Sequence, residues 1–577
     1  MTDEFLLVVL VILVFLTYRL PDWRARYLRL GLILIAFTLP LIRLWQTAES
    51  TWNIVLGLLP WADAMEYYFD ASRLIEGDLF SAFSGRRPLY ASLLAVLLKL
   101  SEQNLQITLI LFTVINGLAV FFFAEEIFKQ LGSVPAVVAM YLSQLFYRPY
   151  VGTTLTEQLG YPVGLLALVI LMRAVKTRIF WLFSLGIMLL TYALLIRAGT
   201  FFVIPILILF GVVNFAKDRR DNIKFSIILL AALAIPILSN SWLGSVIASP
   251  GAVEFANFAD TLYGQARGGV RWTQAVIDHP ELASMTEPDR SRLLYRLAFE
   301  EIKNNPMGLV QGSVKAIVDF IRPGPLSGFG FLNFGNKVID FLSQASAALL
   351  FLFGLWRIWM NRKNAVLAFM FAFWLGTFLS IPFLPPIDAG VRPYAATIGS
   401  LFLPVCFVFY PVVFKSWEDS RLADQMIPVG VSCYVAFALI LLSLIGAPLL
   451  NATARPVHVQ PVTCASGLVP VRFKINTGSY ISLSSQEEIY KTQVPKVLLS
   501  DVRQSFDDFP YGSFASLVRK IREPVLIAAV TDISTGQGMW VVIFGEQKGH
   551  EGQVVSGCAE MIVAVYPVLF IRIPEKP

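Results

Sequence analysis

The sequence predicts a polytopic α-helical membrane protein of about 12 transmembrane helices, followed by a C-terminal extracytoplasmic domain rich in β-structure. Hydrophobic residues make up 56% of the 577 residues, and charged residues only 15%. Apolar runs long enough to cross a bilayer, or nearly so, recur up to residue 447. Residues 448–577 instead carry short strand-like runs broken by Gly, Asn, Asp and Pro.

Twelve apolar runs are the expected spans. They lie at residues 5–18, 30–46, 105–124, 133–147, 158–172, 179–196, 200–216, 225–243, 337–356, 364–383, 395–414 and 426–447. A thirteenth run, residues 88–100, would reach only about 20 Å as a helix, against a hydrocarbon core of about 30 Å. We expect it to lie in the outer membrane interface, with Arg86 and Arg87 before it at headgroup level.

Basic residues orient the chain. With the N-terminus outside, six short inner loops hold seventeen Lys and Arg, whereas three short outer loops hold three. The net charge of +6 is spread over these loops rather than gathered in one patch, so we expect no nucleic-acid partner. The expected domains are a transmembrane domain, 1–447, and an external domain, 448–577. The expected external loops are 47–104, 148–157, 244–336 and 384–394.

Local patterns predict secondary structure in the external regions. Residues 288–305 have a helical pattern, and residues 309–321 are predicted to form an amphipathic segment that approaches the membrane. The glycine-rich stretch 328–335 breaks the spacing of a dinucleotide motif, and we expect a flexible external loop there. In the C-terminal domain the expected strands are 471–476, 496–502, 524–530, 539–545 and 561–573.

Cysteine and histidine usage fits this layout. Cys406 and Cys433 fall inside expected spans, where a thiol behaves as a small apolar residue. An external, oxidising location would allow Cys464 and Cys558 to pair. The three histidines and four cysteines have no zinc-binding spacing, so we expect no structural metal site.

Candidate acids and bases share the external side. Almost no ionisable residue lies near the middle of a span, which argues against an ion-coupled transporter. The candidates are Asp63, Glu66, Asp70, Glu76, Asp78, Glu157, Arg197, Asp388 and Arg392.

Each candidate also has a structural explanation. If residues 64–77 are helical, with Gly77 as the stop, Asp63 would be the N-cap and Glu66 would complete a capping box. Asp70, Glu76 and Asp78 would then be solvated surface residues.

Glu157 opens the apolar span 158–172, where it must stay hydrated, pair with a cation or bind a ligand. Capping by Thr154 or Thr156, with the helix dipole favouring the carboxylate, is the alternative. Arg197 and Arg392 could each be ordinary interfacial anchors.

The segments that contain these candidate residues resemble a known family of proteins. Asp63 is followed by Tyr67, Tyr68, Ala71, Leu74 and Gly77, and then by RRPLYASLLAVLLKL. This pattern resembles the first external loop of the GT-C superfamily of membrane glycosyltransferases, which includes protein mannosyltransferases and the aminoarabinose transferases of lipid A. TTLTEQLG, LLIRAGTFFVIPILILF, EEIKNNPMGL and DAGVRPYAATIGSLFLP resemble later segments of the family, in order, over residues 30–415.

The resemblance implies an enzyme with a polyprenyl-phosphate-linked sugar donor and a glycan, lipid or protein acceptor. Asp63 matches the family's catalytic acid, and Glu157 its second acidic position, which contacts a metal in some relatives. Glu157 is Glu where relatives often have Asp, and the relatives' histidine ligands have no counterpart here. The sequence therefore does not decide whether a divalent cation binds; if one does, Asp63 and Glu157 are its expected ligands.

The chemistry of sugar transfer agrees with these residue types. The acceptor hydroxyl must lose a proton as it attacks the anomeric carbon, and Asp63 is our candidate base. Guanidinium groups would stabilise the departing lipid phosphate. Arg392 is the first choice, followed by Arg86, Arg87 and Arg197, with Tyr67 also at the donor site. Residues 88–100 would form a wall for the lipid tail, and a single displacement would invert the anomeric centre.

Two other functions remain open at this point: a transporter or flippase for a lipid-linked sugar, and a non-catalytic envelope-assembly protein. A nucleotide-driven enzyme is not expected, because the sequence has no GxxxxGK[ST] loop. By its resemblance, we expect the protein in a bacterial inner membrane, surrounded by membrane lipids, with its active site and C-terminal domain outside the cytoplasm.

Overall fold

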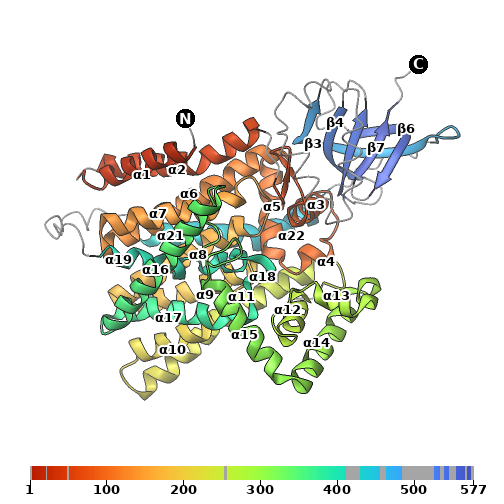
Figure 1. The fold of residues 1–577 in the computed structure, drawn as a ribbon. Coiled ribbons are helices and arrows are strands. Elements are labelled where there is room, and N and C mark those ends of the chain that lie inside the picture. Colours follow the sequence, from red (N-terminus) through yellow and green to blue (C-terminus); the bar gives the residue numbers. More distant parts are fainter. Residues whose placement is uncertain are drawn as a thin grey trace.

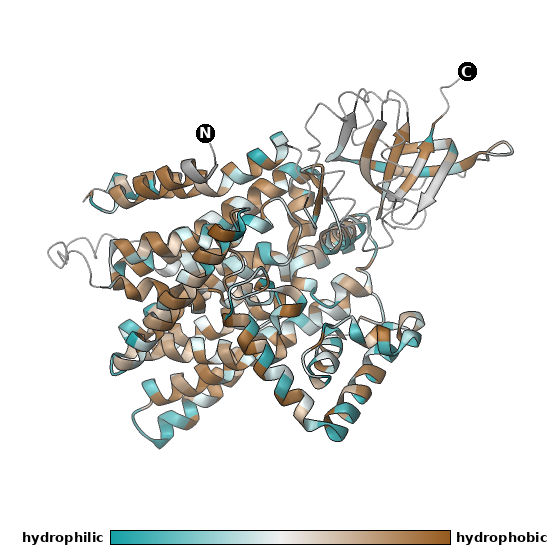
Figure 2. Ribbon diagram, in the orientation of Figure 1, coloured by the Kyte–Doolittle hydropathy of each residue, from teal (hydrophilic) through white to brown (hydrophobic). Residues whose placement is uncertain are grey.

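A bundle of long helices carries shorter helices and a β-barrel at one end (Figure 1). The computed structural model describes residues 3–20, 23–47, 51–252, 256–410, 429–454, 463–483, 525–532, 538–544, 554–565 and 568–573. Brown, hydrophobic residues run along the long helices, as expected for helices surrounded by protein and lipid (Figure 2).

Seven helices in the described part of the chain are long and apolar enough to cross a membrane, and each coincides with a predicted span. They are α2 (Trp23–Thr47), α6 (Leu105–Leu131), α8 (Glu157–Thr177), α11 (Arg219–Ile247), α16 (Lys337–Met360), α17 (Ala365–Ser380) with the 3-10 turn Ile381–Phe383, and the run from α21 (Val429–Leu441) through a π-helical turn (Leu442–Gly446) to α22 (Ala447–Thr453).

The other five predicted spans each contain a shorter helix of between 10 and 17 residues. They are α1 (Asp3–Thr17), α7 (Ser133–Tyr147), α9 (Phe180–Ile196), α10 (Val203–Phe215) and α19 (Gly399–Val408). The total of about twelve spans therefore stays a prediction.

The predicted helix at residues 88–100 forms as α5 (Pro88–Leu100), with Pro88 at its first turn. It does not lie on the surface of the protein, because every residue from Pro88 to Leu98 is buried, and its position at the membrane interface stays a prediction. It packs against α3, α6, α9 and α11 inside the protein. A helix that is apolar on all faces gains more from burial on all faces than from lying on a polar surface.

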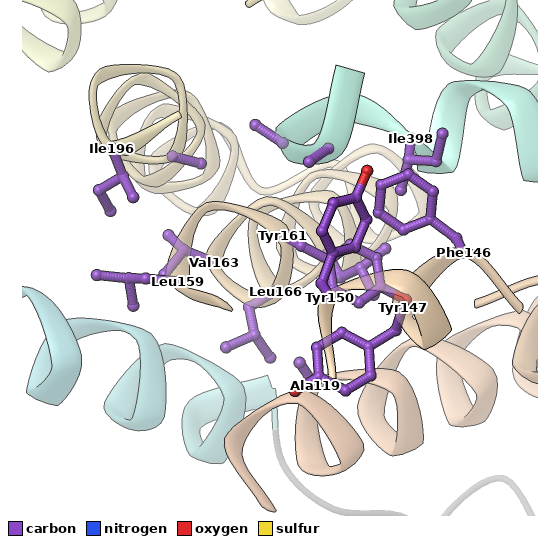
Figure 3. Packing of buried hydrophobic residues seen from close by; sticks show 14 of the residues in the cluster. Ala119, Phe146, Tyr147, Tyr150, Leu159, Tyr161, Val163, Leu166, Ile196 and Ile398 are labelled. Carbon is purple, nitrogen blue, oxygen red and sulfur yellow. The ribbon is translucent and has the colours of Figure 1, made fainter. Parts of the chain in front are cut away.

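An aromatic cluster fixes the start of α8 (Figure 3). Phe146 packs against Tyr150 and Tyr161 with ring centroids 5.3 and 5.2 Å away. The Tyr147 hydroxyl donates to Gln158 Oε1 at 2.7 Å, and Gln158 Nε2 donates to the carbonyl of Tyr150 at 2.6 Å. Each aromatic pair adds about 0.5–1.5 kcal/mol beyond its buried area, so the first turn of α8 is held rigidly.

Short helices cover the end of the bundle where the barrel lies (Figure 1). They are α3 (Asp63–Ile75), α4 (Ala82–Gly85), α12 (Ala256–Ala266), α13 (Gln274–Asp278), α14 (Glu287–Asn304), α15 (Pro306–Ile321) and α18 (Pro386–Ala389); a small hairpin of β1 (Ile54–Val55) and β2 (Leu59–Pro60) precedes α3. The helices predicted at 288–305 and 309–321 are confirmed as α14 and α15.

The glycine-rich stretch 328–335 differs from the expected flexible loop. It has no regular secondary structure, but Phe329 and Phe331 are 3% and 8% exposed. Phe331 packs edge-on against Phe146 and Phe402. The aromatic residues between the glycines therefore anchor this segment in the bundle.

The C-terminal domain is a closed barrel with the strand order β3-β4-β5-β7-β6, in which only β5 and β7 pair in parallel. The predicted strand 471–476 lies within β3, and 524–530 and 539–545 lie within β4 and β5 except for one residue each, whereas 561–573 contains the end of β6 and the whole of β7. Residues 496–502 lie outside the described part of the chain. The strands are β3 (Val469–Leu483), β4 (Val525–Asp532), β5 (Gly538–Phe544), β6 (Val554–Val565) and β7 (Val568–Arg572).

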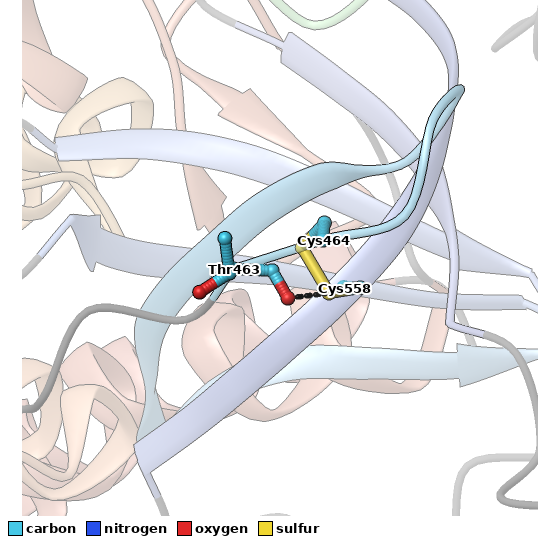
Figure 4. Close-up of a disulfide and its surroundings, with 3 residues drawn as sticks. All are labelled: Thr463, Cys464 and Cys558. Atoms are coloured by element: carbon cyan, nitrogen blue, oxygen red, sulfur yellow. Dashed lines mark hydrogen bonds between the residues drawn. A yellow bond between two sulfur atoms is a disulfide. The ribbon is translucent and has the colours of Figure 1, made fainter.

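A disulfide closes this domain. Cys464 and Cys558, 94 positions apart in the sequence, are bonded, with their Cα atoms 5.6 Å apart (Figure 4). The bond joins the segment before β3 to β6. Cys406 and Cys433 are free thiols in the helical bundle, as predicted.

Candidate active site

Asp63 is the first residue of α3 and faces a cavity at the barrel end of the bundle. The helix begins one residue earlier than an Asp63 cap would require: the N-cap is Ala62, and it has no side-chain capping bond. Asp63 instead accepts a hydrogen bond from Arg392 Nη1 at 2.9 Å, and its side chain is 47% exposed. Gly77 follows the helix with φ 98°, so the predicted stop is confirmed.

Two of the three acids expected on the solvated surface, Asp70 and Glu76, instead have partners in the protein. Asp70 is buried and accepts bonds from the backbone N–H and the hydroxyl of Ser81. Glu76 pairs with Lys474 of the barrel at 3.5 Å. These contacts orient the segment after α3 and hold it against the barrel.

Glu157 opens α8 and is completely buried. The N-cap, Thr156, makes no side-chain capping bond, and Thr154 donates instead to the carbonyl of Ala64 in α3 at 2.6 Å. Two guanidinium groups reach Glu157 Oε1: Arg392 Nε at 2.6 Å and Arg197 Nε at 2.8 Å. The carboxylate is thus paired with cations rather than acting only as a helix-end charge.

Arg392, at the start of the 3-10 turn Arg392–Thr397, joins the two acids. Its Nε contacts Glu157 and its Nη1 contacts Asp63, so one guanidinium bridges residues on α8 and α3. Burial lowers the pKa of Arg392, but the carboxylates of Glu157 and Asp63 outweigh it and raise the pKa above its usual value. Burial lowers the pKa of Arg197 to about 10, and the charge of Glu157 opposes this shift.

Two glycines on one face of α8 allow this close approach. A Cβ on Gly160 would lie 2.5 Å from the Cβ of Arg197. A Cβ on Gly164 would overlap the backbone carbonyl of Ala396, in the turn that begins with Arg392. Any larger residue would push the two arginines away from Glu157.

Arg86 and Arg87 reach the same cavity from the segment between α4 and α5. Arg87 Nη1 donates to the Tyr67 hydroxyl at 3.4 Å, a long and weak bond. Arg86 pairs with Glu287 at 3.1 Å and donates to Asn257. Burial lowers the pKa of Arg86, and Glu287 opposes this change.

The cavity has a volume of about 750 Å³. Its lining includes six of the seven predicted site residues: Asp63, Tyr67, Arg86, Arg87, Arg197 and Arg392. Among the described residues that line it, neither Glu157 nor Glu66 appears. Glu157 lies behind Arg392. The pKa of Glu66 rises to about 7 through burial and the negative charges of Asp70 and Asp63.

The sequence analysis did not identify the cavity-lining residues that come from α12, α14 and the segment between them. Asp260 on α12 pairs with Arg290 on α14, and Trp272 lies between these helices in the sequence. Asp388, singled out without a role, accepts bonds from the backbone N–H of Trp272 at 3.0 Å and from the Thr261 hydroxyl. Burial raises the pKa of Asp388 to about 6. No local pattern marks Asp260 or Trp272, because only the folding of α12–α14 over the bundle brings them here.

The two acids do not form a pair of open metal ligands. Arg392 lies between them and already contacts both carboxylates. No group of three or more His, Cys, Asp or Glu side chains arranged to hold a metal occurs in the described residues. The donor set around Asp63 and Glu157 therefore suits a guanidinium rather than a divalent cation.

Comparison with known proteins gives distant likenesses only. No protein-family model matches the chain, and no curated protein sequence matches it. Among solved structures, the oligosaccharyltransferase of Archaeoglobus fulgidus in complex with zinc and sulfate matches with a TM-score of 0.38 and 14% identity, covering 73% of this chain and 52% of that chain. The archaeal oligosaccharyltransferase AglB of the same organism, in complex with an inhibitory peptide and a dolichol-phosphate, gives 0.36 and 14%, covering 75% and 56%.

The chain thus spans about half the length of the structures it matches. A likeness this distant assigns neither an activity nor a substrate to the chain.

Proposed function

We propose that this protein is a membrane glycosyltransferase that moves a sugar from a polyprenyl-phosphate donor to a hydroxyl-bearing acceptor. The observation that carries the proposal is that one exposed carboxylate, Asp63, meets Arg86, Arg87, Arg197 and Arg392 around one cavity at the end of an apolar helix bundle. A glycosyl phosphate requires both: a base for the acceptor and cations for the leaving phosphate.

The arginines would bind the donor phosphate. Guanidinium groups recognise phosphate through paired N–H bonds, and their charge persists at any physiological pH. Arg392, with a 22% exposed side chain, and Arg87 are best placed to offer N–H groups to the cavity. Tyr67, within reach of Arg87, would hold that guanidinium or the sugar.

An apolar wall would take the first part of the lipid. The cavity is lined by Leu194, Leu195, Phe202 and Phe383, which come from the end of α9, the start of α10 and the turn after α17. This replaces our expectation that residues 88–100 form the wall, because α5 is buried beneath α3 and does not line the cavity.

In the transfer step, the acceptor oxygen would form a bond to the anomeric carbon as the bond from that carbon to the phosphate oxygen breaks. The electron pair of the broken bond leaves with the polyprenyl phosphate, whose growing charge Arg392 and its neighbours would stabilise. The acceptor proton passes to Asp63. The acceptor hydroxyl becomes more acidic as its oxygen bonds to carbon, so a carboxylate suffices as base. Single displacement would invert the anomeric centre.

Glu157 would act through the arginines. Its burial behind Arg392 favours a positioning role over direct contact with the reacting atoms, which we propose in place of a catalytic one. One buried carboxylate facing two guanidiniums fixes both and offsets part of their charge. A bacterial inner-membrane location, with site and barrel on the outer side, remains part of the proposal and is supported by the positive-inside loops and the disulfide.

The test is transfer of labelled sugar by the purified protein in nanodiscs from a panel of polyprenyl-phosphate donors, comparing wild type with Asp63→Asn. We expect the variant to lose about a hundredfold or more in kcat while donor binding and folding are retained. NMR of the product would establish whether the anomeric centre is inverted.

Donor binding without transfer by the wild type, across glycan, lipid and protein acceptors, would contradict the proposal. That result would favour a flippase or an envelope-assembly protein instead.

A further inference from the structure

Two faces of helix α3 contact different parts of the molecule. With 3.6 residues per turn, Asp63, Tyr67 and Asp70 share one face, and Met65, Tyr68 and Phe69 share the other. The first face carries Asp63 and Tyr67 to the cavity. The second face is buried, with Tyr68 completely so.

The C-terminal barrel covers that second face. Trp540 Nε1 lies 3.0 Å from Met65 Sδ, and the rings of Trp540 and Phe69 are 5.6 Å apart. The Tyr68 hydroxyl donates to Ser479 Oγ at 2.7 Å and accepts from Asn476 Nδ2 at 3.1 Å.

In the strands facing α3, the described outward-facing side chains Ile527, Ala529, Trp540 and Val542 are all buried. Along β5, Val541 and Ile543 point into the barrel, whereas Trp540 and Val542 belong to the hydrophobic core of the helical bundle. β4 alternates in the same way: Ile527 and Ala529 join the helical core, and their neighbours fill the barrel. Successive residues of a strand point to opposite faces, so both faces of this part of the barrel are apolar and buried. An independent module would have a polar outer face here.

We infer that the barrel is a clamp that sets the position of α3, with Tyr68 and Trp540 as positioning residues for Asp63. The inference rests on the proposed function of Asp63. A helix of 13 residues is marginal on its own, so α3 depends on what packs against both faces. A displacement of about 1 Å at a reacting group can reduce a rate by about a hundredfold.

The experiment compares four variants of the full-length protein in nanodiscs. Tyr68→Phe keeps the ring and removes only the hydroxyl that bonds Ser479 and Asn476. Trp540→Ala removes the ring against Met65 and Phe69, and Trp540→Phe partly restores it. Val541→Ala is the matched control, because it truncates an equally buried residue on the same strand that points into the barrel.

Two readouts are needed: steady-state kinetics, and amide hydrogen exchange of residues 63–75. We expect kcat to fall about tenfold in Tyr68→Phe and more in Trp540→Ala, with the donor KM within about twofold and partial recovery in Trp540→Phe. Exchange in α3 should rise in the same order, and Val541→Ala should stay near wild type in both.

Unchanged exchange in α3 in Tyr68→Phe and Trp540→Ala would overturn the clamp. So would faster exchange at unchanged kcat, since the position of α3 would then not matter to the reaction. A wild type that transfers no sugar would overturn the proposed function, while hydrogen exchange would still decide whether the barrel holds α3. If Trp540→Ala does not fold, the exchange and kcat of Tyr68→Phe alone decide whether the barrel sets the position of α3.

Discussion

A buried arginine–glutamate group lies near each end of the helical bundle, and the group at the barrel end opens onto the cavity of about 750 Å³. At the end away from the barrel, Arg29 on α2 pairs with Glu125 on α6, donates to the Thr17 hydroxyl and lies 3.7 Å from the centre of the Tyr18 ring. Both side chains are 7% exposed. At the barrel end, Arg392 joins fully buried Glu157 to Asp63, whose side chain is 47% exposed.

The difference separates a structural group from a functional one. The Arg29 guanidinium contacts Thr17, Glu125 and the Tyr18 ring, so its charge serves to tie α1, α2 and α6 together. Arg392 and Asp63 keep accessible atoms that could meet a substrate. Burial of an arginine–carboxylate pair is by itself weak evidence for either role, and the opening to the cavity decides between them.

The largest contrast is expected from replacing each arginine with lysine. Arg392→Lys should reduce kcat by about a hundredfold or more, because one ammonium group cannot bridge two carboxylates and a phosphate in the geometry of a planar guanidinium. Arg29→Lys should leave kcat within about twofold and lower the melting temperature instead. Labelled-sugar transfer and thermal unfolding of both variants measure this, and equal losses of kcat would break the comparison.

Removing the buried acids comes next. Glu157→Gln leaves Arg197 without its counter-charge and Arg392 with Asp63 alone, so we expect kcat to fall by about ten- to a hundredfold together with a loss of stability. Glu125→Gln should cost stability of about 3–5 kcal/mol, the usual cost of breaking a buried pair, with kcat nearly unchanged. A Glu157→Gln variant with normal kcat and only a lower melting temperature would make the two groups equivalent.

A third acid, Asp388, lines the same cavity as Arg392, and its carboxylate accepts hydrogen bonds from Trp272 and Thr261. Its pKa in the folded protein, about 6, is above the usual value of 3.8. The folded state therefore binds more protons than the unfolded state between these values, and this residue's contribution to stability falls as pH rises through that window.

Asp388→Asn is neutral at every pH, so its melting temperature should exceed that of the wild type by a few degrees at pH 8. The gap should close near pH 4. Melting curves at both pH values test this, and a constant gap would mean that Asp388 does not titrate in this range.

The smallest effect is expected from chelation. Because Arg392 already contacts both Asp63 and Glu157, EDTA should change kcat by less than about twofold. A loss of more than about tenfold that Mg²⁺ or Mn²⁺ restores would show that a cation enters the site and that Arg392 moves aside.

The sequence determined the class of fold and much of the site. Apolar runs are local properties of the chain, and seven of the twelve predicted spans are long apolar helices in the structure. Strand-like runs broken by Gly, Asn, Asp and Pro likewise located β3, β4 and β5. Glu157 was recognisable because a charged residue at the end of an apolar run is costly unless it has a partner or a task. Asp63 was singled out by the resemblance of its segment to a membrane glycosyltransferase loop, and Arg197 and Arg392 by the need for guanidinium groups beside a leaving phosphate.

Tertiary structure decided which charges meet and which surfaces are buried. Arg392 is far from Asp63 in the sequence, and no local pattern says that one guanidinium reaches both acids. The burial of α5 and the packing of Trp540 against α3 also depend on partners distant in the chain. Hydrophobicity specifies that a surface will be covered, but it is non-directional. The covering element is chosen by shape and by specific hydrogen bonds, such as the one that Tyr68 donates to Ser479 and the one that it accepts from Asn476, which form only when the whole chain is folded.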